Sequence, residues 1–197
     1  MNHPHRNPGH KVACLTRIHK DLKLTSHEGA KRWVQATDSN GVPHALNTQI
    51  VCANSKKEGC VYYEDDEEAQ YRFETLYLPE KGNIIVEDRR SVTPERVLEF
   101  TQEGAANLHS MLSAEDGRDV IVHCHAGMNR SVAIIVRYAM DYKKWGFDEA
   151  RDYIRRINWE QRRIPPRKTL SNPVFHDVLR TYHDRGKGTE AIKARWE

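Results

Sequence analysis

Residues 119–142 read DVIVHCHAGMNRSVAIIVRYAMDY, and this stretch decides the fold class. It begins with a short apolar run of β type and ends with an apolar run, residues 132–140, that is too long for a second strand and predicts a helix. Small and polar residues, 123–131, lie between the two runs. A strand, a small-residue loop and a helix N-terminus in this order predict an anion-binding site, because backbone N–H groups and the helix dipole both favour negative charge there.

Two side chains of this loop predict chemistry as well as binding. Cys124 begins the loop and Arg130 ends it, so both can face one bound phosphate. A helix N-terminus and a neighbouring arginine both favour the thiolate form of a cysteine, which is its nucleophilic form. The planar guanidinium of Arg130 offers parallel donors to two phosphoryl oxygens. We therefore predict that Cys124 attacks phosphorus while Arg130 holds the phosphoryl group.

The remaining loop residues are assigned supporting roles. The Ser131 hydroxyl can donate a hydrogen bond to the cysteine sulfur and help it to leave when a phospho-enzyme is hydrolysed. Gly127 removes a side chain where the backbone must approach the anion closely. His123 ends the strand and is predicted to brace the loop, not to act as a base. The residues predicted to bind substrate are His125, Ala126, Gly127, Met128 and Asn129.

The alternative for the nucleophile is an inert core cysteine, which is the usual state of a single cysteine in an apolar strand. The combined spacing of Cys124, Arg130 and Ser131 between a strand and a helix argues against that alternative.

Composition predicts one folded domain without a membrane segment. The chain has 197 residues, of which 38% are hydrophobic and 30% charged, and it holds no apolar run of about 18 residues. We expect a flexible leader over residues 1–14, a catalytic domain over 15–183 and a polar tail over 184–197. The net charge of +3 permits an anionic substrate without requiring a nucleic acid.

The four cysteines form no CxxC pair, which argues against a zinc site and against a disulfide framework. We therefore expect no metal, no cofactor and a reducing, cytoplasmic location.

Strand patterns alternate with helix patterns and then give way to helices, which predicts an α/β fold with helices packed against one sheet. Strands are expected within residues 45–53, 72–78 and 120–122. Helices are expected after the caps Ser26 and Thr93, over 147–157 and over 174–182.

The sequence HCHAGMNRS resembles the signature loop of cysteine-dependent protein tyrosine phosphatases, and specifically of their dual-specificity subgroup. An Asn before the arginine and a Ser after it are similar to small viral members of the poxvirus type. LSNPVF, residues 170–175, with Leu179 and Tyr182 after it, is similar to the C-terminal helix of that subgroup. The resemblance covers residues 15–183 and implies the protein-tyrosine-phosphatase-like fold, with a central, mostly parallel sheet flanked by helices.

This resemblance implies a hydrolase that removes phosphate from tyrosine and from serine or threonine in proteins through a cysteinyl-phosphate intermediate. The family supplies a general acid from a loop after the preceding strand, and Val86–Glu87–Asp88 resembles that segment. Asp88 is therefore the predicted acid, although it lies further from the cysteine along the chain than is usual in the subgroup. Glu80 and Glu87 are its rivals.

Cys52 ends a predicted strand at a position similar to a cysteine that pairs with the nucleophile under oxidation in some members of the family. A reactive thiolate is the most oxidisable group in a chain. Cys52 is therefore either the redox partner of Cys124 or a plain buried cysteine.

Three questions of function stay open at this point. The basic residues of 151–168 form either a solvated face or a docking surface for an acidic phosphoprotein or RNA. An RNA 5′-phosphatase or triphosphatase of the same superfamily and a catalytically silent phosphoprotein-binding scaffold are the alternative functions. The oligomeric state is also open, and a homodimer is one of the options.

Overall fold

The computed structural model describes residues 15–53, 75–77, 93–114 and 117–187. The predicted leader and the three candidate acids, Glu80, Glu87 and Asp88, lie outside these ranges.

Five strands form one sheet in the order β1-β2-β5-β3-β4. Their bounds are Thr16–Arg17 for β1, Leu22–Ser26 for β2, Thr48–Cys52 for β3, Thr75–Tyr77 for β4 and Asp119–Cys124 for β5. β1 runs antiparallel to β2, and the other three pairs are parallel. The prediction of a mostly parallel sheet is confirmed, and β5, the strand that ends at Cys124, lies at its centre.

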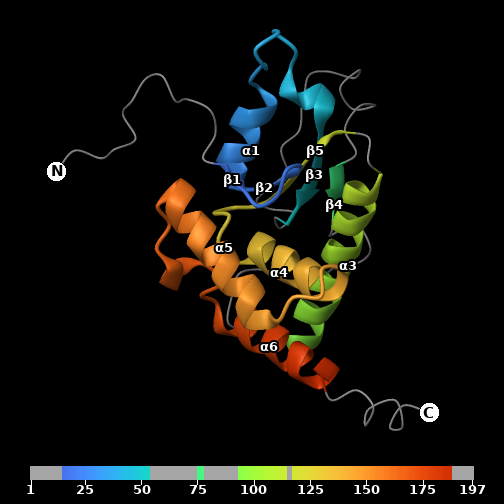
Figure 1. Cartoon of the computed structure of the whole chain (residues 1–197), viewed down its shortest axis with the longest axis vertical. Helices are drawn as coiled ribbons and strands as arrows, with labels where there is room; N and C mark the ends of the chain where they lie inside the picture. Colours follow the sequence, from blue (N-terminus) through green and yellow to red (C-terminus); the bar gives the residue numbers. More distant parts are fainter. Residues whose placement is uncertain (1–14, 54–74, 78–92, 115–116, 188–197) are drawn as a thin grey trace, which may run out of the picture.

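Helices cover both faces of the sheet (Figure 1). α1 (His27–Val34) packs on one face, and α3 (Pro94–Ser113), α4 (Arg130–Tyr142), α5 (Phe147–Arg162) and α6 (Pro173–Lys187) gather on the other. Two short 3₁₀ helices, η1 (His44–Asn47) and η2 (Pro166–Lys168), complete the described elements. The α/β architecture predicted from the sequence is therefore confirmed.

Side chains of β5 alternate between two apolar clusters, as the pleat of a strand requires. Val122 and Cys124 belong to the large core beneath α3–α6, whereas Ile121 belongs to a smaller cluster beneath α1 that includes Trp33 and Ile50. A central parallel strand is buried on both faces, which explains the continuous apolar run at 120–122.

Local capping signals set the starts of two helices where the sequence predicts them. The Ser26 hydroxyl accepts from the Gly29 N–H at 3.1 Å at the start of α1. Thr93 plays the same role for Arg96 N–H, at 3.4 Å, with a proline in the first turn of α3. Both contacts satisfy N–H groups that have no partner inside the helix.

Three predicted bounds differ from the structure. The predicted strand over 45–53 divides into η1 and β3, and the helix predicted to end at residue 157 continues to Arg162. Apolar periodicity ends at Ile157 because the last turn of α5 faces solvent, so the pattern gave no signal for it. α6 continues to Lys187, beyond the helix end predicted at residue 182.

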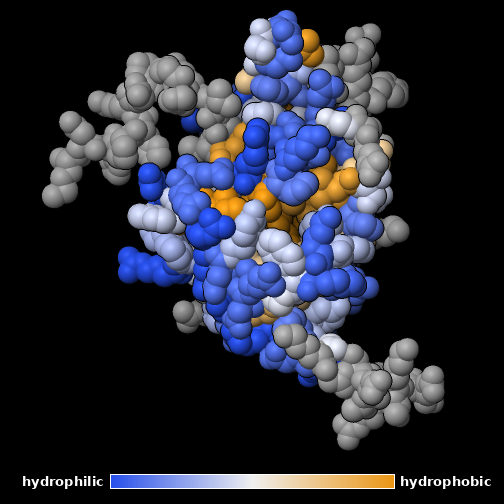
Figure 2. Space-filling view, viewed as in Figure 1, coloured by the Kyte–Doolittle hydropathy of each residue, from blue (hydrophilic) through white to orange (hydrophobic). Residues whose placement is uncertain are grey.

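The face drawn in Figure 2 is largely hydrophilic, with apolar residues gathered near its middle. Among the described residues, three large apolar side chains are substantially exposed, namely Val42, Tyr142 and Trp159. Within the same residues, none of the helices combines the length and the apolar character needed to cross a membrane.

Candidate active site

Cys124 and Arg130 lie at the two ends of one loop, as predicted. β5 ends at Cys124, residues 125–129 form the loop, and α4 begins at Arg130. Both side chains are buried, each with 3% of its surface exposed. The loop therefore lies at the carboxyl end of a central parallel strand, where sheets of this kind commonly bind ligands.

Ser131 contacts the cysteine directly. The Cys124 Sγ and Ser131 Oγ atoms lie 3.1 Å apart, and the serine is fully buried. A thiolate has no proton to give, so the serine hydroxyl is the donor whenever the cysteine is ionised. The predicted contact is confirmed, and its role in turnover stays a prediction.

Backbone donors from two distant segments bind carbonyl groups at either end of the loop. The His27 N–H, at the start of α1, donates to the His125 carbonyl at 3.1 Å. The Leu170 N–H, shortly before α6, donates to the Met128 carbonyl at 2.8 Å. The first and last peptide groups of the loop are thus fixed from outside.

Arg162, in the last turn of α5, binds the carbonyl groups of the two residues that lie between His125 and Met128. Its Nη2 donates to the Ala126 carbonyl and its Nη1 to the Gly127 carbonyl, both at 3.2 Å. Four consecutive carbonyl oxygens of the loop, from residue 125 to residue 128, therefore accept hydrogen bonds from other parts of the chain.

The direction of these carbonyls determines the direction of the amides. In a trans peptide the C=O of one residue and the N–H of the next point in opposite directions, and the described chain contains no cis peptide. The N–H groups of residues 126–129 are consequently turned away from the external donors and toward the inside of the loop. Successive N–H groups with this orientation form an anion-binding nest.

Gly127 is required by its conformation and by a close neighbour. Its φ is +66°, a region that other residues rarely adopt. A Cβ atom there would lie 2.4 Å from the Thr25 carbonyl oxygen and 2.8 Å from Arg162 Nη1. The sequence predicts a glycine because of close approach to an anion, whereas the close approach in the structure is to the backbone of β2.

The Asn129 side chain faces the C-terminal segment. Its Oδ1 accepts from the Ser171 N–H at 2.8 Å and from the Asn172 N–H at 3.1 Å. It makes no side-chain cap for α4. The backbone N–H of Asn129 thus belongs to the nest, whereas its side chain holds residues 171 and 172 in place.

The remaining predicted binding residues differ in exposure. His125 is exposed, and Ala126 and Met128 are half-buried.

His123 is fully buried at the base of the loop, and its ring centroid lies 5.7 Å from that of His27. Burial, aided by the nearby charges of His27 and Arg130, lowers the pKa of His123 to about 3. The imidazole is therefore neutral at physiological pH and a weak base, consistent with its predicted bracing role.

Cys52 differs from the expectation. It is disulfide-bonded, and its partner is not Cys124, because Cys124 is a free thiol. The sequence offered pairing with Cys124 or a plain buried cysteine at this position, and the structure shows neither. In the register of β3 and β5, Cys52 lies opposite His123, the residue before Cys124. Pairing of Cys52 with Cys124 stays a prediction, and it first requires reduction of the existing bond.

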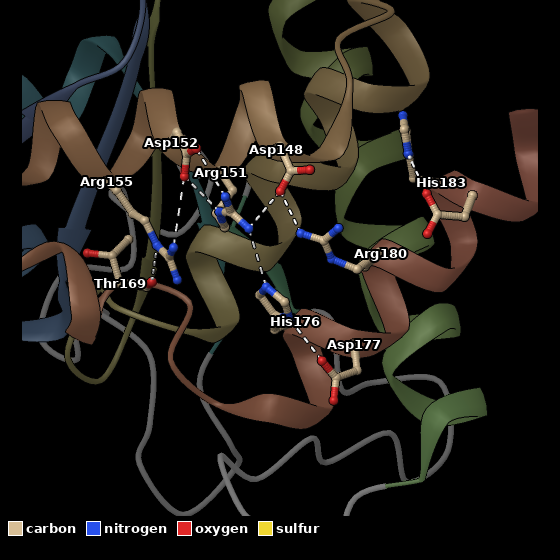
Figure 3. A network of polar contacts seen from close by, with 10 residues as sticks. Asp148, Arg151, Asp152, Arg155, Thr169, His176, Asp177, Arg180 and His183 are labelled. Carbon is tan, nitrogen blue, oxygen red and sulfur yellow. Dashed lines mark hydrogen bonds and ion pairs between the residues drawn. The ribbon is translucent and has the colours of Figure 1, made fainter.

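Three basic residues of 151–168 pair with acidic neighbours, namely Arg151 and Arg155 in the network of Figure 3 and Arg156 with Glu160. Arg151 lies 2.7 Å from Asp148 and 2.7 Å from Asp152, and Arg180 of α6 lies 2.6 Å from Asp148. This network joins α5 to α6.

Within the described part of the chain, no group of three or more His, Cys, Asp or Glu side chains could hold a metal ion.

Sequence reasoning missed Arg162, Leu170 and His27 as parts of the site. A basic residue in the last turn of a helix is usually explained by the helix dipole, so Arg162 gave no distinct signal. The other two act through backbone N–H groups, which every residue except proline carries.

Comparison with known proteins agrees with this geometry. A family model described as the dual specificity phosphatase catalytic domain matches residues 24–184. The protein-tyrosine-phosphatase IBR5 of Arabidopsis thaliana is 25% identical over 173 residues, which make up 88% of this chain and 52% of the relative. The chain spans 42% of a second relative, the tyrosine-protein phosphatase yvh1 of Schizosaccharomyces pombe, so it covers about half the length of the curated relatives it matches.

Solved structures share the fold at low sequence identity. Human DUSP28 superposes with a TM-score of 0.56 at 17% identity, covering 88% of this chain and 95% of that one. OH1 from the Orf virus, a tyrosine phosphatase, has a TM-score of 0.53 at 18% identity, covering 86% of each chain. The predicted resemblance to this family is confirmed by the family model, and the viral protein shares the fold.

Proposed function

The chain belongs to the dual-specificity phosphatase family, and from this premise we propose that it removes phosphate from phosphotyrosine and from phosphoserine or phosphothreonine in proteins. Such an enzyme is a phosphoric monoester hydrolase. The observation that carries the proposal is the arrangement of the loop, in which a buried cysteine lies 3.1 Å from a serine hydroxyl and four successive carbonyl groups are bound from outside the loop.

The first half of the proposed reaction transfers the phosphoryl group to sulfur. The Cys124 thiolate forms an S–P bond as the P–O bond to the leaving oxygen breaks, and a general acid protonates that oxygen. The guanidinium of Arg130 and the loop amides bind the phosphoryl oxygens and stabilise their charge in the transition state.

The second half regenerates the enzyme. Water attacks phosphorus, the S–P bond breaks with its electron pair on sulfur, and inorganic phosphate leaves. The Ser131 hydroxyl stabilises the departing thiolate through the contact at 3.1 Å. No step of this route requires a metal ion.

Asp88 is the proposed acid, with Glu87 and Glu80 as rivals, and all three lie outside the described residues. A carboxylic acid that donates in the first step and accepts from water in the second controls the pH dependence of the rate. The pH–rate profile of Asp88→Asn tests this assignment. The basic limb of the profile should disappear, and an unchanged profile would transfer the role to Glu87 or Glu80.

We propose that acidic residues of the substrate, close to its phosphate group, strengthen its binding to this chain. Arg163, Arg167 and Lys168 are exposed and form no ion pair within the described residues. They lie between the end of α5 and Leu170, which contacts the loop. A substrate with acidic residues should therefore show a KM that rises with ionic strength, because screening weakens attraction between exposed charges.

One assay distinguishes the functions that the family permits. Wild-type protein and Cys124→Ser are tested on a phosphotyrosyl peptide, a phosphothreonyl peptide and RNA with a 5′-triphosphate. We expect the wild type to hydrolyse both peptides and the variant to hydrolyse neither. Turnover of RNA alone would establish the RNA 5′-triphosphatase alternative. Tight peptide binding without turnover would establish the silent scaffold.

Asn129 weakens the RNA alternative. Its Oδ1 already accepts from the N–H groups of residues 171 and 172, so this oxygen is turned toward the C-terminal segment and not toward a nucleotide. The side chains of His125 and Met128 add no permanent cation for a longer anion.

The proposed cytoplasmic location follows from the chemistry of the thiolate, which an oxidising compartment would inactivate. Mild peroxide should abolish activity, and a thiol reductant should restore it. Mass spectrometry of reduced protein after peroxide tests the proposed Cys52–Cys124 bond, and Cys52→Ser serves as the control.

Sedimentation of the same sample measures whether a homodimer forms.

A further inference from the structure

We propose that Arg162 is a positioning residue of the phosphate loop, which locks two peptide groups so that their N–H groups face the bound phosphoryl oxygens. The proposal deepens the phosphatase function and rests on it. Arg162 would touch neither the substrate nor the reacting atoms. It would act through the backbone of Ala126 and Gly127.

The geometry of the contact is specific to this pair of carbonyls. Two different nitrogens of one guanidinium donate to two successive carbonyl oxygens, each at 3.2 Å. Because the peptides are trans, the Ala126 carbonyl and the Gly127 N–H belong to one planar amide and point in opposite directions. The Gly127 carbonyl and the Met128 N–H form the next amide in the same way.

Gly127 makes a lock necessary. Glycine populates positive and negative φ with similar ease, so the peptide groups on either side of it rotate more readily than others. Rotation of either group would turn a carbonyl oxygen toward the phosphate and an N–H away from it. An anion repels the oxygen and attracts the N–H, so the orientation of these two amides decides whether the loop binds.

The charge of Arg162 adds a second effect. A cation that binds a carbonyl oxygen polarises the whole amide, which makes the N–H at its other end a stronger donor. Arg162 is half-buried, so water screens this interaction only in part. Its guanidinium therefore strengthens, through the backbone, the two N–H groups that it orients.

Arg156 provides a matched control within the same helix. Its guanidinium is exposed and pairs with Glu160 at 3.3 Å, away from the loop. Arg156→Ala and Arg162→Ala remove the same charge and the same side chain from α5. A difference between them reports the contact with the loop and not the net charge of the protein.

The experiment measures kcat and KM for a small aryl phosphate and the affinity of inorganic phosphate, determined from the rise in the melting temperature. For Arg162→Ala we expect kcat/KM to fall about 10- to 100-fold, the loss of hydrogen bonds to a charged group. Phosphate affinity should fall by a similar factor. Arg156→Ala should stay within about twofold of the wild type, as exposed ion pairs contribute little.

Chemical rescue separates positioning from general stability. Guanidinium ion, added below the concentration that unfolds the protein, should raise the activity of Arg162→Ala and leave that of Arg156→Ala unchanged. Arg162→Lys keeps the charge but not the fork, so its activity should fall between those of the wild type and Arg162→Ala. This variant keeps the test informative where Arg162→Ala does not fold.

The proposal is overturned if Arg162→Ala retains wild-type kcat/KM and phosphate affinity, or if Arg156→Ala loses as much. It is also overturned if folded Arg162→Lys matches the wild type in both measurements. Failure of the phosphatase function itself gives a different result. In that case the wild type hydrolyses no phosphoester, while the phosphate affinities of the two alanine variants still differ as expected.

Discussion

The contact between Cys124 and Ser131 joins a strand to the first turn of a helix, and it bears on both halves of the proposed reaction. A hydroxyl that donates to sulfur stabilises the thiolate before attack and again as it departs. The second effect is the larger one for turnover, because sulfur regains its charge as the S–P bond breaks.

Ser131→Ala should therefore slow breakdown of the phospho-enzyme more than its formation. A hydrogen bond to a charged group is worth about 1.5–3 kcal/mol, so kcat should fall about 10- to 150-fold. Rapid-mixing kinetics with an aryl phosphate should show a burst of released alcohol that the wild type lacks. Ser113→Ala, an exposed serine of α3, is the control. An unchanged kcat without a burst would contradict the assigned role.

The lowered pKa of His123 leads us to expect that the free energy of unfolding depends on pH. Its pKa is about 3 in the folded chain against an ordinary value of 6.5. Above pH 6.5 neither the folded nor the unfolded chain binds the proton, and between pH 6.5 and about 3 only the unfolded chain does. Stability should consequently be lost as the pH falls from 6.5 toward 3, by at most about 1.4 kcal/mol per pH unit.

Denaturant unfolding of the wild type and of His123→Gln between pH 7 and pH 4 measures this effect. The wild type should lose more free energy of unfolding over this interval than the variant loses. His19→Gln, an exposed histidine, should behave like the wild type. Equal losses in the wild type and His123→Gln would show that the buried imidazole does not carry the effect.

At the scale of elements, the close packing of α3 against α4 places the loop-bearing helix on the sheet. Gly104 of α3 makes this approach possible. A Cβ atom at Gly104 would lie 2.7 Å from Ile134 Cγ1 and 2.8 Å from Ile134 Cδ1. Atoms at these distances overlap, so one of the two helices would have to shift.

Gly104→Ala should destabilise the fold. Alanine in place of a glycine inside a helix gains about 1 kcal/mol of propensity, but overpacking costs about 1–3 kcal/mol. In the background of Ile134→Ala the overlap disappears, and the same substitution should become stabilising. Free energies of unfolding for the four proteins of this cycle provide the measurement. Destabilisation by Gly104→Ala in both backgrounds would show that packing against Ile134 is not the cause.

At the scale of the whole molecule, the loop is assembled by segments far apart in the sequence. Donors reach it from the start of α1, from the end of α5 and from the residues before α6. Asn129 makes the contact with the residues before α6, where one oxygen of its side chain accepts hydrogen bonds from two backbone N–H groups. Folding of the C-terminal helices and formation of the anion site are thereby linked.

Two substitutions at Asn129 separate stability from anion binding. Asn129→Ala leaves two N–H groups without their acceptor and should lower the free energy of unfolding by about 1–3 kcal/mol. Asn129→Asp keeps an acceptor but adds a negative charge beside the loop. Its melting temperature should stay close to that of the wild type, while phosphate affinity and kcat/KM fall. A melting temperature as low as that of Asn129→Ala would argue against the two hydrogen bonds as the cause.

The order of local elements was predictable, because strands, caps and apolar helices are encoded by neighbouring residues. The bounds of α5 and η1 were less predictable, because exposed final turns and short 3₁₀ segments carry no apolar period. The general acid was assigned by resemblance alone, and all three candidates lie outside the described residues.

The sequence by itself determined that Cys124, Arg130 and Ser131 meet at one strand–loop–helix junction, since their positions follow from a short run of chain with local signals. Only the tertiary structure decided how the amides of that loop are turned. The contacts that turn them and anchor the loop join residues at least 35 positions apart, and several use backbone N–H groups, which every residue except proline carries. No periodicity, cap or motif encodes such contacts, because they exist only after the sheet and the C-terminal helices have packed.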